Sequence, residues 1–213
     1  MKAAATSVCI LAMGLLTSIP SRAESSLPPC QGSDSNTWHN CFGKQETYAG
    51  GVYEGQFRFG KRDGAGQWYE VYVQLGRQRE IYVGEFKEDM RHGRGEFINS
   101  VGEIYSGDWK ENQRDGEGTE KSPSGEQYVG QWKSDRPNGR GTKTWADGRQ
   151  YVGEFSRGNG IQGILTWPNG AKFEGPEISG APTGDGTLSY PDGSTITGRF
   201  SGGRYIGPTP GGR

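Results

Sequence analysis

The pattern of apolar and polar positions along this chain repeats at a nearly constant interval. Four tyrosines stand 23 residues apart, namely Tyr82, Tyr105, Tyr128 and Tyr151. Each begins the sequence Tyr-x-Gly-x-Phe or Tyr-x-Gly-x-Trp, so the tyrosine, the glycine and the second aromatic residue share one face of a strand. A helix would need apolar residues at three- and four-residue intervals, and it would tolerate glycine poorly. The pattern therefore predicts a β-strand in each copy.

A second strand is predicted after each of these strands. A polar stretch, such as residues 87–92, leads to a Gly-x-Gly sequence, as at Gly93 and Gly95, and each unit ends at a turn signal such as Ala-Asp-Gly at 146–148. This residue order indicates a type I turn closed by a left-handed glycine. Each period is then one β-hairpin, and connections this short predict an antiparallel meander. We expect the central glycine of each strand to lie beneath aromatic rings from neighbouring strands.

Less regular copies extend the array on both sides. Tyr53 begins an earlier copy that carries six inserted residues around 71–79. Phe173 begins a later copy, which follows the loss of one residue near Ile161, and Ile196 begins a degenerate last copy. About six to seven hairpins, or about 14 strands, are therefore expected in one elongated sheet.

Residues 1–23 have the features of a signal peptide. Lys2 supplies a positive charge, residues 8–16 form an apolar segment, and residues 21–23 form a small-x-small cleavage site. We therefore expect a protein exported from a bacterial cell, either periplasmic or secreted. No later stretch approaches the roughly 18 apolar residues that a transmembrane helix requires. The rest of the chain divides into an N-terminal cap with half a repeat (24–47), the repeat array (48–200) and a C-terminal tail (201–213).

Cys30 and Cys41 are the two cysteines that remain after residues 1–23 are removed. An even number of cysteines in an oxidising compartment favours a disulfide. It would close a loop of about 12 residues, worth about 3 kcal/mol in chain-entropy terms. A lipid anchor on Cys30 and a metal site that includes His39 are the alternatives. Two cysteines and one histidine fall short of the four ligands of a structural zinc site.

The composition agrees with an extended sheet. The chain has 38 glycines in 213 residues, far above the usual share of about 7%, and these serve turns and close packing. Only 31% of the residues are hydrophobic, which is too few for a deep two-layer core. Without residues 1–23, which hold Lys2 and Arg22, 22 basic residues stand against 25 acidic ones. This balance gives no electrostatic reason to expect a nucleic acid or an anionic membrane as partner.

The repeated motif resembles that of the MORN-repeat family (membrane occupation and recognition nexus) from residue 53 to about residue 200. The resemblance implies an elongated single-layer sheet of hairpins with a groove, acting in protein–protein contact, self-association and, in some members, phospholipid binding. Many members carry a kinase or methyltransferase domain beside the repeats, for which these 213 residues leave no room. The chain departs from the pattern at Ile161, Pro176 and Ile196, so we expect the last two units to be less regular and to act as a cap.

No catalytic motif stands out, and we expect no enzymatic activity, cofactor or metal. Neither His39 nor His92 lies beside a serine or cysteine in a nucleophile motif. The sequence 158–163 fits Gly-x-Gly-x-x-Gly, but a strand follows it where a dinucleotide site would need a helix. The acids Glu85 and Asp108 recur with the repeat and point to the face opposite the aromatic residues. They indicate a solvated outer face rather than a catalytic pair.

The aromatic residues are the best candidates for function. The tyrosines and the second aromatic residues are expected to form two ladders on one face, and most of these rings would form the core of a single-layer sheet. Rings at the rim of a groove could also bind a partner protein or a second copy of the chain. A cell-wall glycan such as peptidoglycan, or a lipid headgroup, is the alternative ligand. The candidate binding residues are Tyr82, Tyr105, Trp109, Tyr128, Trp132 and Tyr151.

Overall fold

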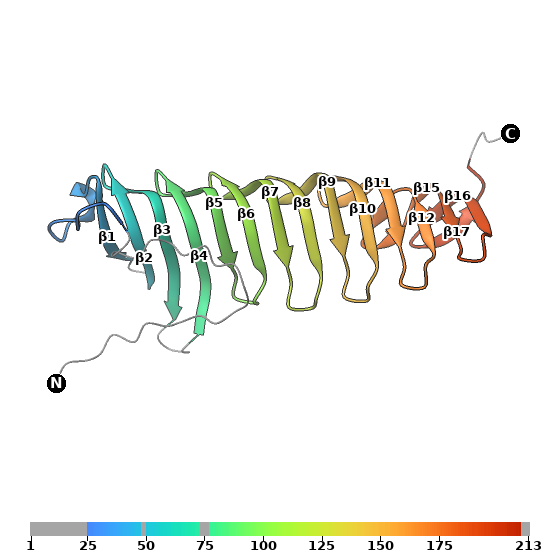
Figure 1. Ribbon diagram of the computed structural model, residues 1–213, viewed down its shortest axis with the longest axis horizontal. Coiled ribbons are helices and arrows are strands. Elements are labelled where there is room, and N and C mark those ends of the chain that lie inside the picture. The colour runs from blue at the N-terminus through green and yellow to red at the C-terminus, as the bar shows by residue number, and fades with distance from the viewer. Residues whose placement is uncertain (1–24, 48–49, 73–76, 210–213) are drawn as a thin grey trace.

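A computed structural model describes residues 25–47, 50–72 and 77–209 of the chain. These residues form one elongated antiparallel sheet of 17 strands, in which each strand of the regular part pairs with the next along the chain (Figure 1). The predicted all-β meander is confirmed. The predicted signal peptide, residues 1–23, lies outside the described residues. Within the described part of the chain, no helix has the length and apolar character to cross a membrane.

The strands are 2 to 12 residues long, and one 3₁₀ turn, η1 (Ser35–Thr37), precedes them among the described residues. Their bounds are β1 Cys41–Glu46, β2 Gly51–Arg58, β3 Lys61–Tyr72, β4 Arg77–Lys87, β5 Met90–Ile98, β6 Ile104–Lys110, β7 Gln113–Lys121, β8 Gln127–Lys133, β9 Arg136–Thr144, β10 Gln150–Ser156, β11 Asn159–Thr166, β12 Lys172–Glu174, β13 Glu177–Ile178, β14 Ala181–Pro182, β15 Gly184–Ser189, β16 Thr195–Ser201 and β17 Arg204–Gly207. The expected number of about 14 strands is too low, because the shortened C-terminal unit is divided into the brief strands β12, β13 and β14.

Glycines that face each other set the register of the hairpins. The facing pairs are Gly55–Gly66, Gly84–Gly95, Gly107–Gly118, Gly130–Gly141 and Gly153–Gly163. In the hairpin of β6 and β7, the register shifts after Gly107, which makes a β-bulge. Gly116 lies in this bulge with φ 121°, a conformation that side chains rarely adopt. The first glycine of the Gly-x-Gly sequence is therefore needed for the bulge, and the second for the pairing.

Two kinds of turn alternate along the sheet. At Trp145–Arg149 the Gly148 N–H donates to the Trp145 carbonyl (2.9 Å) and φ of Gly148 is 86°, which agrees with the predicted turn closed by a left-handed glycine. At the other long edge, the polar stretch 87–92 contains only two turn residues, Glu88 (φ 49°) and Asp89 (φ 70°). Two successive positive φ values define a tight type I′ hairpin turn.

The insertion around residues 71–79 lengthens one hairpin. Strand β3 continues to Tyr72, and β4 begins at Arg77, with Val71 opposite Gln78 and Tyr72 opposite Arg77. The described residues of this segment, 71–72 and 77–79, therefore extend the two strands beyond their neighbours, as the long β3–β4 hairpin in Figure 1 shows.

The core is a single row of interleaved aromatic rings, not the two separate ladders expected from the sequence. From Tyr53 to Tyr128, each tyrosine of the row lies between the second aromatic residue of its own strand and that of the next hairpin, and Tyr151 contacts, among the described rings, only Phe155 of its own strand. Ring centroids are 4.9 to 5.3 Å apart and the planes meet at 80° to 89°, the edge-to-face geometry that aromatic pairs favour. The pairs are Tyr53–Phe57, Tyr53–Phe86, Tyr82–Phe86, Tyr82–Trp109, Tyr105–Trp109, Tyr105–Trp132, Tyr128–Trp132, Tyr128–Phe155 and Tyr151–Phe155.

The central glycines make room for these rings. A side chain at Gly118 would collide with the ring of Tyr105, which reaches across from the neighbouring strand, as expected. At Gly107 the covering ring is also that of Tyr105, which belongs to the same strand and not to a neighbouring one. One tyrosine thus covers both facing glycines of its hairpin, which is why the two glycines recur together.

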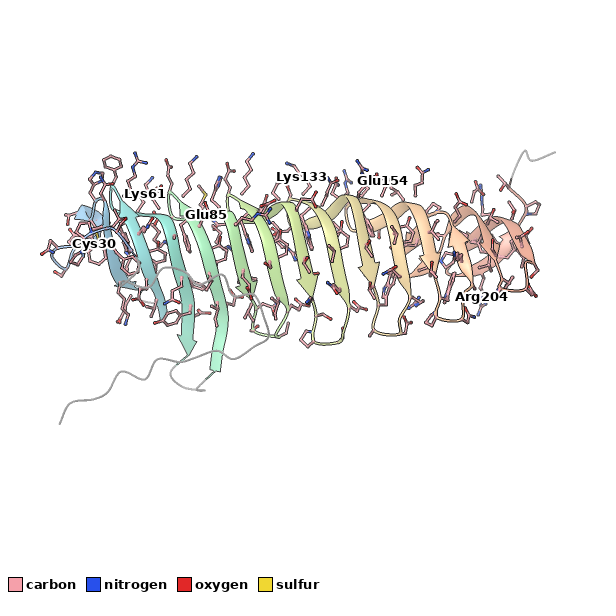
Figure 2. The ribbon with its side chains drawn as sticks, in the orientation of Figure 1. Cys30, Lys61, Glu85, Lys133, Glu154 and Arg204 are labelled. Atoms are coloured by element: carbon pink, nitrogen blue, oxygen red, sulfur yellow. A yellow bond between two sulfur atoms is a disulfide. The ribbon has the colours of Figure 1, made fainter. Side chains whose placement is uncertain are left out.

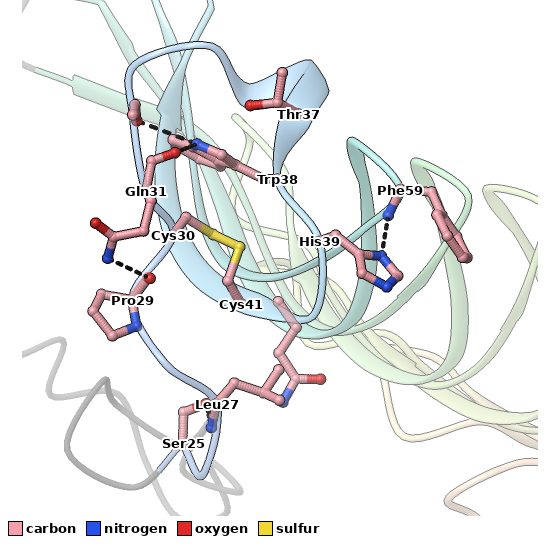
Figure 3. Close-up of a disulfide and its surroundings, with 12 residues drawn as sticks. Ser25, Leu27, Pro29, Cys30, Gln31, Thr37, Trp38, His39, Cys41 and Phe59 are labelled. Atoms are coloured by element: carbon pink, nitrogen blue, oxygen red, sulfur yellow. Dashed lines mark hydrogen bonds between the residues drawn. A yellow bond between two sulfur atoms is a disulfide. The ribbon is translucent and has the colours of Figure 1, made fainter.

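The first edge of the sheet is closed by the N-terminal segment. Cys30 and Cys41 form the predicted disulfide (Figure 3). The Cys30 N–H donates to the Phe42 carbonyl (3.0 Å), and the Phe42 N–H donates to the Pro28 carbonyl (2.8 Å). Trp38 is buried and packs edge-on against Phe57, with ring centroids 4.8 Å apart. The segment before β1 therefore occupies backbone groups of the edge strand that would otherwise be open.

Candidate functional site

The six residues singled out from the sequence all lie in the core row. None of them exposes more than 4% of its surface. They form the floor of the inner face, and their participation in binding stays a prediction. The residues are Tyr82, Tyr105, Trp109, Tyr128, Trp132 and Tyr151.

The polar atoms of these side chains are used within the fold. The Tyr105 hydroxyl donates to the Asp108 carbonyl (3.0 Å), and the same bond recurs at the equivalent tyrosines of β2, β4 and β8. The indole Nε1–H of Trp109 donates to the Gly95 carbonyl (3.2 Å). Burial raises the pKa of Tyr105 well above its usual value. These rings therefore hold the hairpins together through both their faces and their polar ends.

A groove of about 300 Å³ lies above this floor, on the part of the inner face formed by β4 to β7 and the turn between β8 and β9. Its aromatic and apolar walls are completed by four carboxylates, two guanidinium groups and one amide. The lining residues are Glu80, Arg91, Phe97, Asn99, Glu103, Ile104, Tyr105, Trp109, Arg114, Glu120 and Asp135. We call this surface the inner groove.

The second strands of the hairpins differ at the position that faces the tyrosine, and this difference brings charged residues into the inner groove. The positions that pair with the tyrosines are Trp68 in β3, Phe97 in β5, Glu120 in β7 and Lys143 in β9. The inward position is thus aromatic near the N-terminal end and charged in the middle of the sheet. At this position the lining of the inner groove therefore carries Phe97 on the β5 side and Glu120 on the β7 side.

Arginines link three successive hairpins each to the next one, a feature that the sequence analysis missed. Arg62 donates to Asp89 from its backbone N–H (2.9 Å to Oδ1), from Nε (3.1 Å to Oδ1) and from Nη2 (2.9 Å to the carbonyl). In return, the Asp89 N–H donates to the Arg62 carbonyl (3.0 Å). Asp89 is the second residue of the next two-residue turn, so the pair fixes one turn to the hairpin before it. We call this arrangement the arginine clamp.

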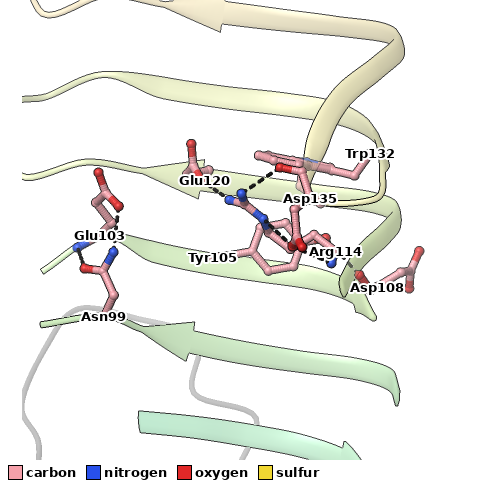
Figure 4. Close-up of polar contacts among 9 residues, drawn as sticks. Asn99, Glu103, Tyr105, Asp108, Arg114, Glu120, Trp132 and Asp135 are labelled. Carbon is pink, nitrogen blue, oxygen red and sulfur yellow. Dashed lines mark hydrogen bonds and ion pairs between the residues drawn. The ribbon is translucent and has the colours of Figure 1, made fainter. Parts of the chain in front are cut away.

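The same clamp recurs at Arg114. Its Nε lies 3.3 Å from Asp135 Oδ1, its Nη2 donates to the Asp135 carbonyl (2.7 Å), and its Nη1 pairs with Glu120. The guanidinium lies 4.2 Å from the ring centroid of Trp132. Figure 4 shows Arg114 between the two carboxylates, with Tyr105 beside it. The charge of this arginine is therefore fully compensated inside the protein.

The acids of the outer face also have a structural role that the sequence did not reveal. Glu85 and Asp108 each accept a hydrogen bond from a backbone N–H in the β-bulge opposite, and a glutamine does the same at two equivalent positions because only an acceptor is needed. The bonds are Ala65 N–H to Gln56 (3.2 Å), Arg94 N–H to Glu85 (3.1 Å), Glu117 N–H to Asp108 (2.8 Å) and Arg140 N–H to Gln131 (2.9 Å). Figure 2 shows side chains of both charges along the long edge that carries the two-residue turns, where Lys61, Lys133 and Glu154 project.

Among the described residues, no group of three or more His, Cys, Asp or Glu side chains has the arrangement of a metal site. The cysteines that could have joined His39 are joined to each other. The His39 Nδ1 instead accepts from the backbone N–H of Phe59 (3.2 Å), as Figure 3 shows. The inner groove is thus the one feature described above that combines depth, charge and aromatic walls.

The MORN repeat pattern matches six segments of the chain, which together cover more than half of it: residues 53–69, 82–103, 105–127, 128–148, 151–172 and 179–195. The chain belongs to the MORN-repeat family. MORN repeats generally bind proteins or lipids and are generally not enzymes. No curated protein matches the sequence.

Solved structures give only distant matches. The TCP domain of SAS-4 (dCPAP) from Drosophila melanogaster, solved with a proline-rich motif of Ana2, is 11% identical, with 73% of this chain and 87% of that one covered and a TM-score of 0.36. A streptogramin B lyase is 12% identical over 75% of this chain and 54% of the other, and virginiamycin B lyase from Staphylococcus aureus is 12% identical over 81% and 58%. Both lyases have a TM-score of 0.17. Likenesses this weak support no argument about function.

Proposed function

We propose that this chain is a non-enzymatic protein-binding module that takes a peptide segment of a partner into the inner groove. The observation that carries the proposal is the pair of guanidinium groups, Arg91 and Arg114, which lie over Trp109 and Trp132 in a groove of about 300 Å³. Arginine and tryptophan are the residues that most often dominate protein–protein interfaces. Repeats on both sides of the groove hold these groups in place before a partner arrives, which lowers the entropic cost of binding.

The chemistry of the groove favours a peptide over the alternative ligands. A sugar ring stacks on an open aromatic face, but the rings of Trp109 and Trp132 are buried, and guanidinium groups lie over them. An anionic lipid headgroup would meet four carboxylates and only two arginines in the groove lining. A peptide offers backbone donors and acceptors, apolar side chains and single charges of either sign, which matches the mixed lining.

The proposed setting is the envelope of a bacterial cell, where the chain would act as a scaffold or assembly module after export. The sequence features of residues 1–23 and the Cys30–Cys41 disulfide support this setting, because disulfides persist in oxidising compartments. Expression with a bacterial export system and mass spectrometry of the N-terminus would test it. A mature chain that begins at Glu24 supports export, and retention of residues 1–23 in the cytoplasm refutes it.

Binding in three parallel assays tests the proposed function. The purified chain is offered a displayed library of random peptides, purified peptidoglycan and vesicles that contain phosphatidylglycerol. We expect enrichment of peptides and no sedimentation with peptidoglycan or vesicles. Sedimentation with either, without enrichment of peptides, would refute the proposal in favour of a glycan or lipid ligand.

A matched pair of charge reversals locates the binding surface. Glu103 lines the inner groove, and Glu126 is the equivalent exposed residue of the next repeat, outside the lining. Glu103→Lys is expected to change which peptides bind, whereas Glu126→Lys is expected to leave the selected peptides bound. Equal effects of the two substitutions would place the binding surface elsewhere.

A further inference from the structure

The three arginine clamps are not equivalent. Arg62 and Arg114 each pair with a carboxylate, Asp89 and Asp135, at the second position of the next turn. At the same position, Arg91 meets Asn112, whose side chain is neutral. The backbone bonds of the clamp are kept, because the Arg91 N–H donates to Asn112 Oδ1 (2.9 Å) and the Asn112 N–H donates to the Arg91 carbonyl (3.0 Å).

The difference leaves donors of Arg91 free. Its Nη2 donates to the Asn112 carbonyl (3.0 Å), but Nε and Nη1 have no hydrogen-bond acceptor among the described residues. In Arg114 the same two atoms pair with Asp135 and Glu120. The residue of β5 that corresponds to Glu120 is Phe97, which cannot accept a hydrogen bond. In the described part of the chain, no carboxylate lies within the 4 Å of an ion pair with Arg91.

The position of Arg91 suits a ligand. The side chain is half-buried in the wall of the inner groove, 4.4 Å from the ring centroid of Trp109 and 5.0 Å from that of Phe97. These rings and the bond to Asn112 fix the plane of the guanidinium group. Burial lowers the pKa of Arg91 from its usual value, and the nearby Tyr82, Asp135 and Glu80 oppose this shift. A fixed guanidinium with two free donors is well arranged to bind a carboxylate.

We propose that Arg91 binds a carboxylate of the partner peptide, an aspartate, a glutamate or a C-terminus, through Nε or Nη1, the atoms that pair with Asp135 and Glu120 in the clamp of Arg114. This inference rests on the proposed function and names the chemistry of the segment that enters the inner groove. Glu80 and Glu103 line the same groove, so the residues that flank this carboxylate in the partner are neutral or basic. A run of acidic residues would be repelled.

Asn112→Asp tests the inference with Arg91 itself left in place. The substitution supplies the carboxylate that the other clamps have, so the variant competes internally with the ligand for Arg91 and should fold at least as stably as the original chain. Asp89→Asn is the matched control, because it makes the reverse change at the clamp of Arg62, outside the groove lining. Thermal unfolding of both variants verifies the fold before binding is measured.

The probes are peptides selected from the random library by the original chain, each synthesised with a twin in which Glu or Asp is replaced by Gln or Asn. Loss of one charge-assisted hydrogen-bonded pair is expected to weaken binding about 10-fold or more. We expect this loss for the neutral twin on the original chain, and for the acidic peptide on Asn112→Asp, with Asp89→Asn unchanged.

The outcomes separate this inference from the proposed function. Twins that bind as well as their acidic parents, or an Asn112→Asp variant that binds as the original chain does, overturn the role of Arg91. If the binding of those peptides still changes when Glu103→Lys is introduced, the inner groove remains a peptide site and the proposed function stands. Failure to select any peptide that responds to Glu103→Lys overturns both.

Discussion

The regular repeat that begins at Tyr105 and the shortened repeat that begins at Tyr151 satisfy their hydrogen-bond donors in different ways. In the regular repeat, the Tyr105 hydroxyl donates to the Asp108 carbonyl (3.0 Å) and the Asp108 carboxylate accepts from the Glu117 N–H (2.8 Å), so the bonds close within one hairpin. In the shortened repeat, the Tyr151 hydroxyl donates to the Gly175 carbonyl (3.3 Å), which lies in the following unit.

The shortened repeat depends on one buried acid. Glu177 exposes 1% of its surface and accepts from the backbone N–H groups of Gly160 (3.3 Å) and Gly180 (2.6 Å). It lies in the gap between the matched segments 151–172 and 179–195. The hairpin that lost one residue thus has a backbone donor, the Gly160 N–H, whose acceptor comes from the next unit. A regular repeat supplies the acceptors for its own hydrogen-bond donors, whereas the shortened repeat takes them from the following unit.

Alkaline pH should affect the regular repeats most. Burial raises the pKa of Tyr53, Tyr82, Tyr105 and Tyr128 well above its usual value, and it raises the pKa of Tyr151 less, to about 12. In the unfolded chain these groups ionise near pH 10. Their contribution to stability is therefore complete below about pH 10 and is lost as pH rises from there towards the folded pKa values, by about 1.4 kcal/mol per pH unit for each tyrosine.

Urea unfolding at several alkaline pH values measures this loss. Titration of the tyrosines by ultraviolet absorbance is expected to show Tyr151 ionising before the four tyrosines of the regular repeats. A chain whose stability does not change above about pH 10, or whose tyrosines all ionise near that value, would contradict the burial of the tyrosines in the aromatic row.

Replacing Glu177 should be the most damaging single change to the shortened repeat. Glu177→Ala removes the acceptor of two backbone N–H groups, and we expect a loss of about 2 to 4 kcal/mol in the free energy of unfolding. Glu174→Ala, three residues earlier at an exposed position, is the control and should be nearly neutral. Urea unfolding compares the two. Equal stability of both variants would show that water or a backbone shift satisfies the two donors instead.

Removal of a single tyrosine hydroxyl also distinguishes the two kinds of repeat, with a smaller expected loss of stability. Tyr105→Phe deletes a short bond inside the hairpin and should cost about 1 kcal/mol. Tyr151→Phe deletes the longer bond to Gly175 (3.3 Å) and should cost less. Thermal unfolding of the two variants gives the order, and a larger loss for Tyr151→Phe would reverse our view of which repeat supplies its own acceptors.

The smallest expected effect concerns the outer face. Glu85 serves as an acceptor for the Arg94 N–H, and equivalent positions carry glutamine, so Glu85→Gln should change stability by less than about 0.5 kcal/mol. Glu85→Ala removes the acceptor and should cost about 1 kcal/mol. The difference between the two variants in urea unfolding isolates the hydrogen bond from the charge. If both cost the same, the negative charge itself is what the position requires.

The fold could be predicted because its determinants are local and recur. The alternation within Tyr-x-Gly-x-Phe/Trp and the left-handed glycines such as Gly148 specify a hairpin without reference to the rest of the chain. The disulfide followed from the even number of cysteines. The interleaving of the rings was missed, because it depends on how far each ring reaches towards the next hairpin.

The candidate site could be predicted only in part. The aromatic residues were found, but their burial follows from the curvature and twist of the sheet, which the sequence does not state. The arginine clamps join residues such as Arg114 and Asp135, which are brought together by the register of two hairpins. One signal was present: an arginine occupies the second position after each of three successive two-residue turns, at Arg62, Arg91 and Arg114. A comparison of the turns alone would have revealed that Asn112 replaces an aspartate.

The interleaved row of rings has an optical consequence. Tyr105 lies 5.2 Å from both Trp109 and Trp132, and Tyr82 and Tyr128 also contact tryptophans. At such separations, the excitation energy of a tyrosine is transferred to a tryptophan before the tyrosine fluoresces. The electronic transitions of neighbouring rings also couple with each other. The folded chain should therefore emit as tryptophan alone and give strong near-ultraviolet circular dichroism. Because the tryptophans of this row lie below the inner groove, their emission would report an occupant of that groove without any added label.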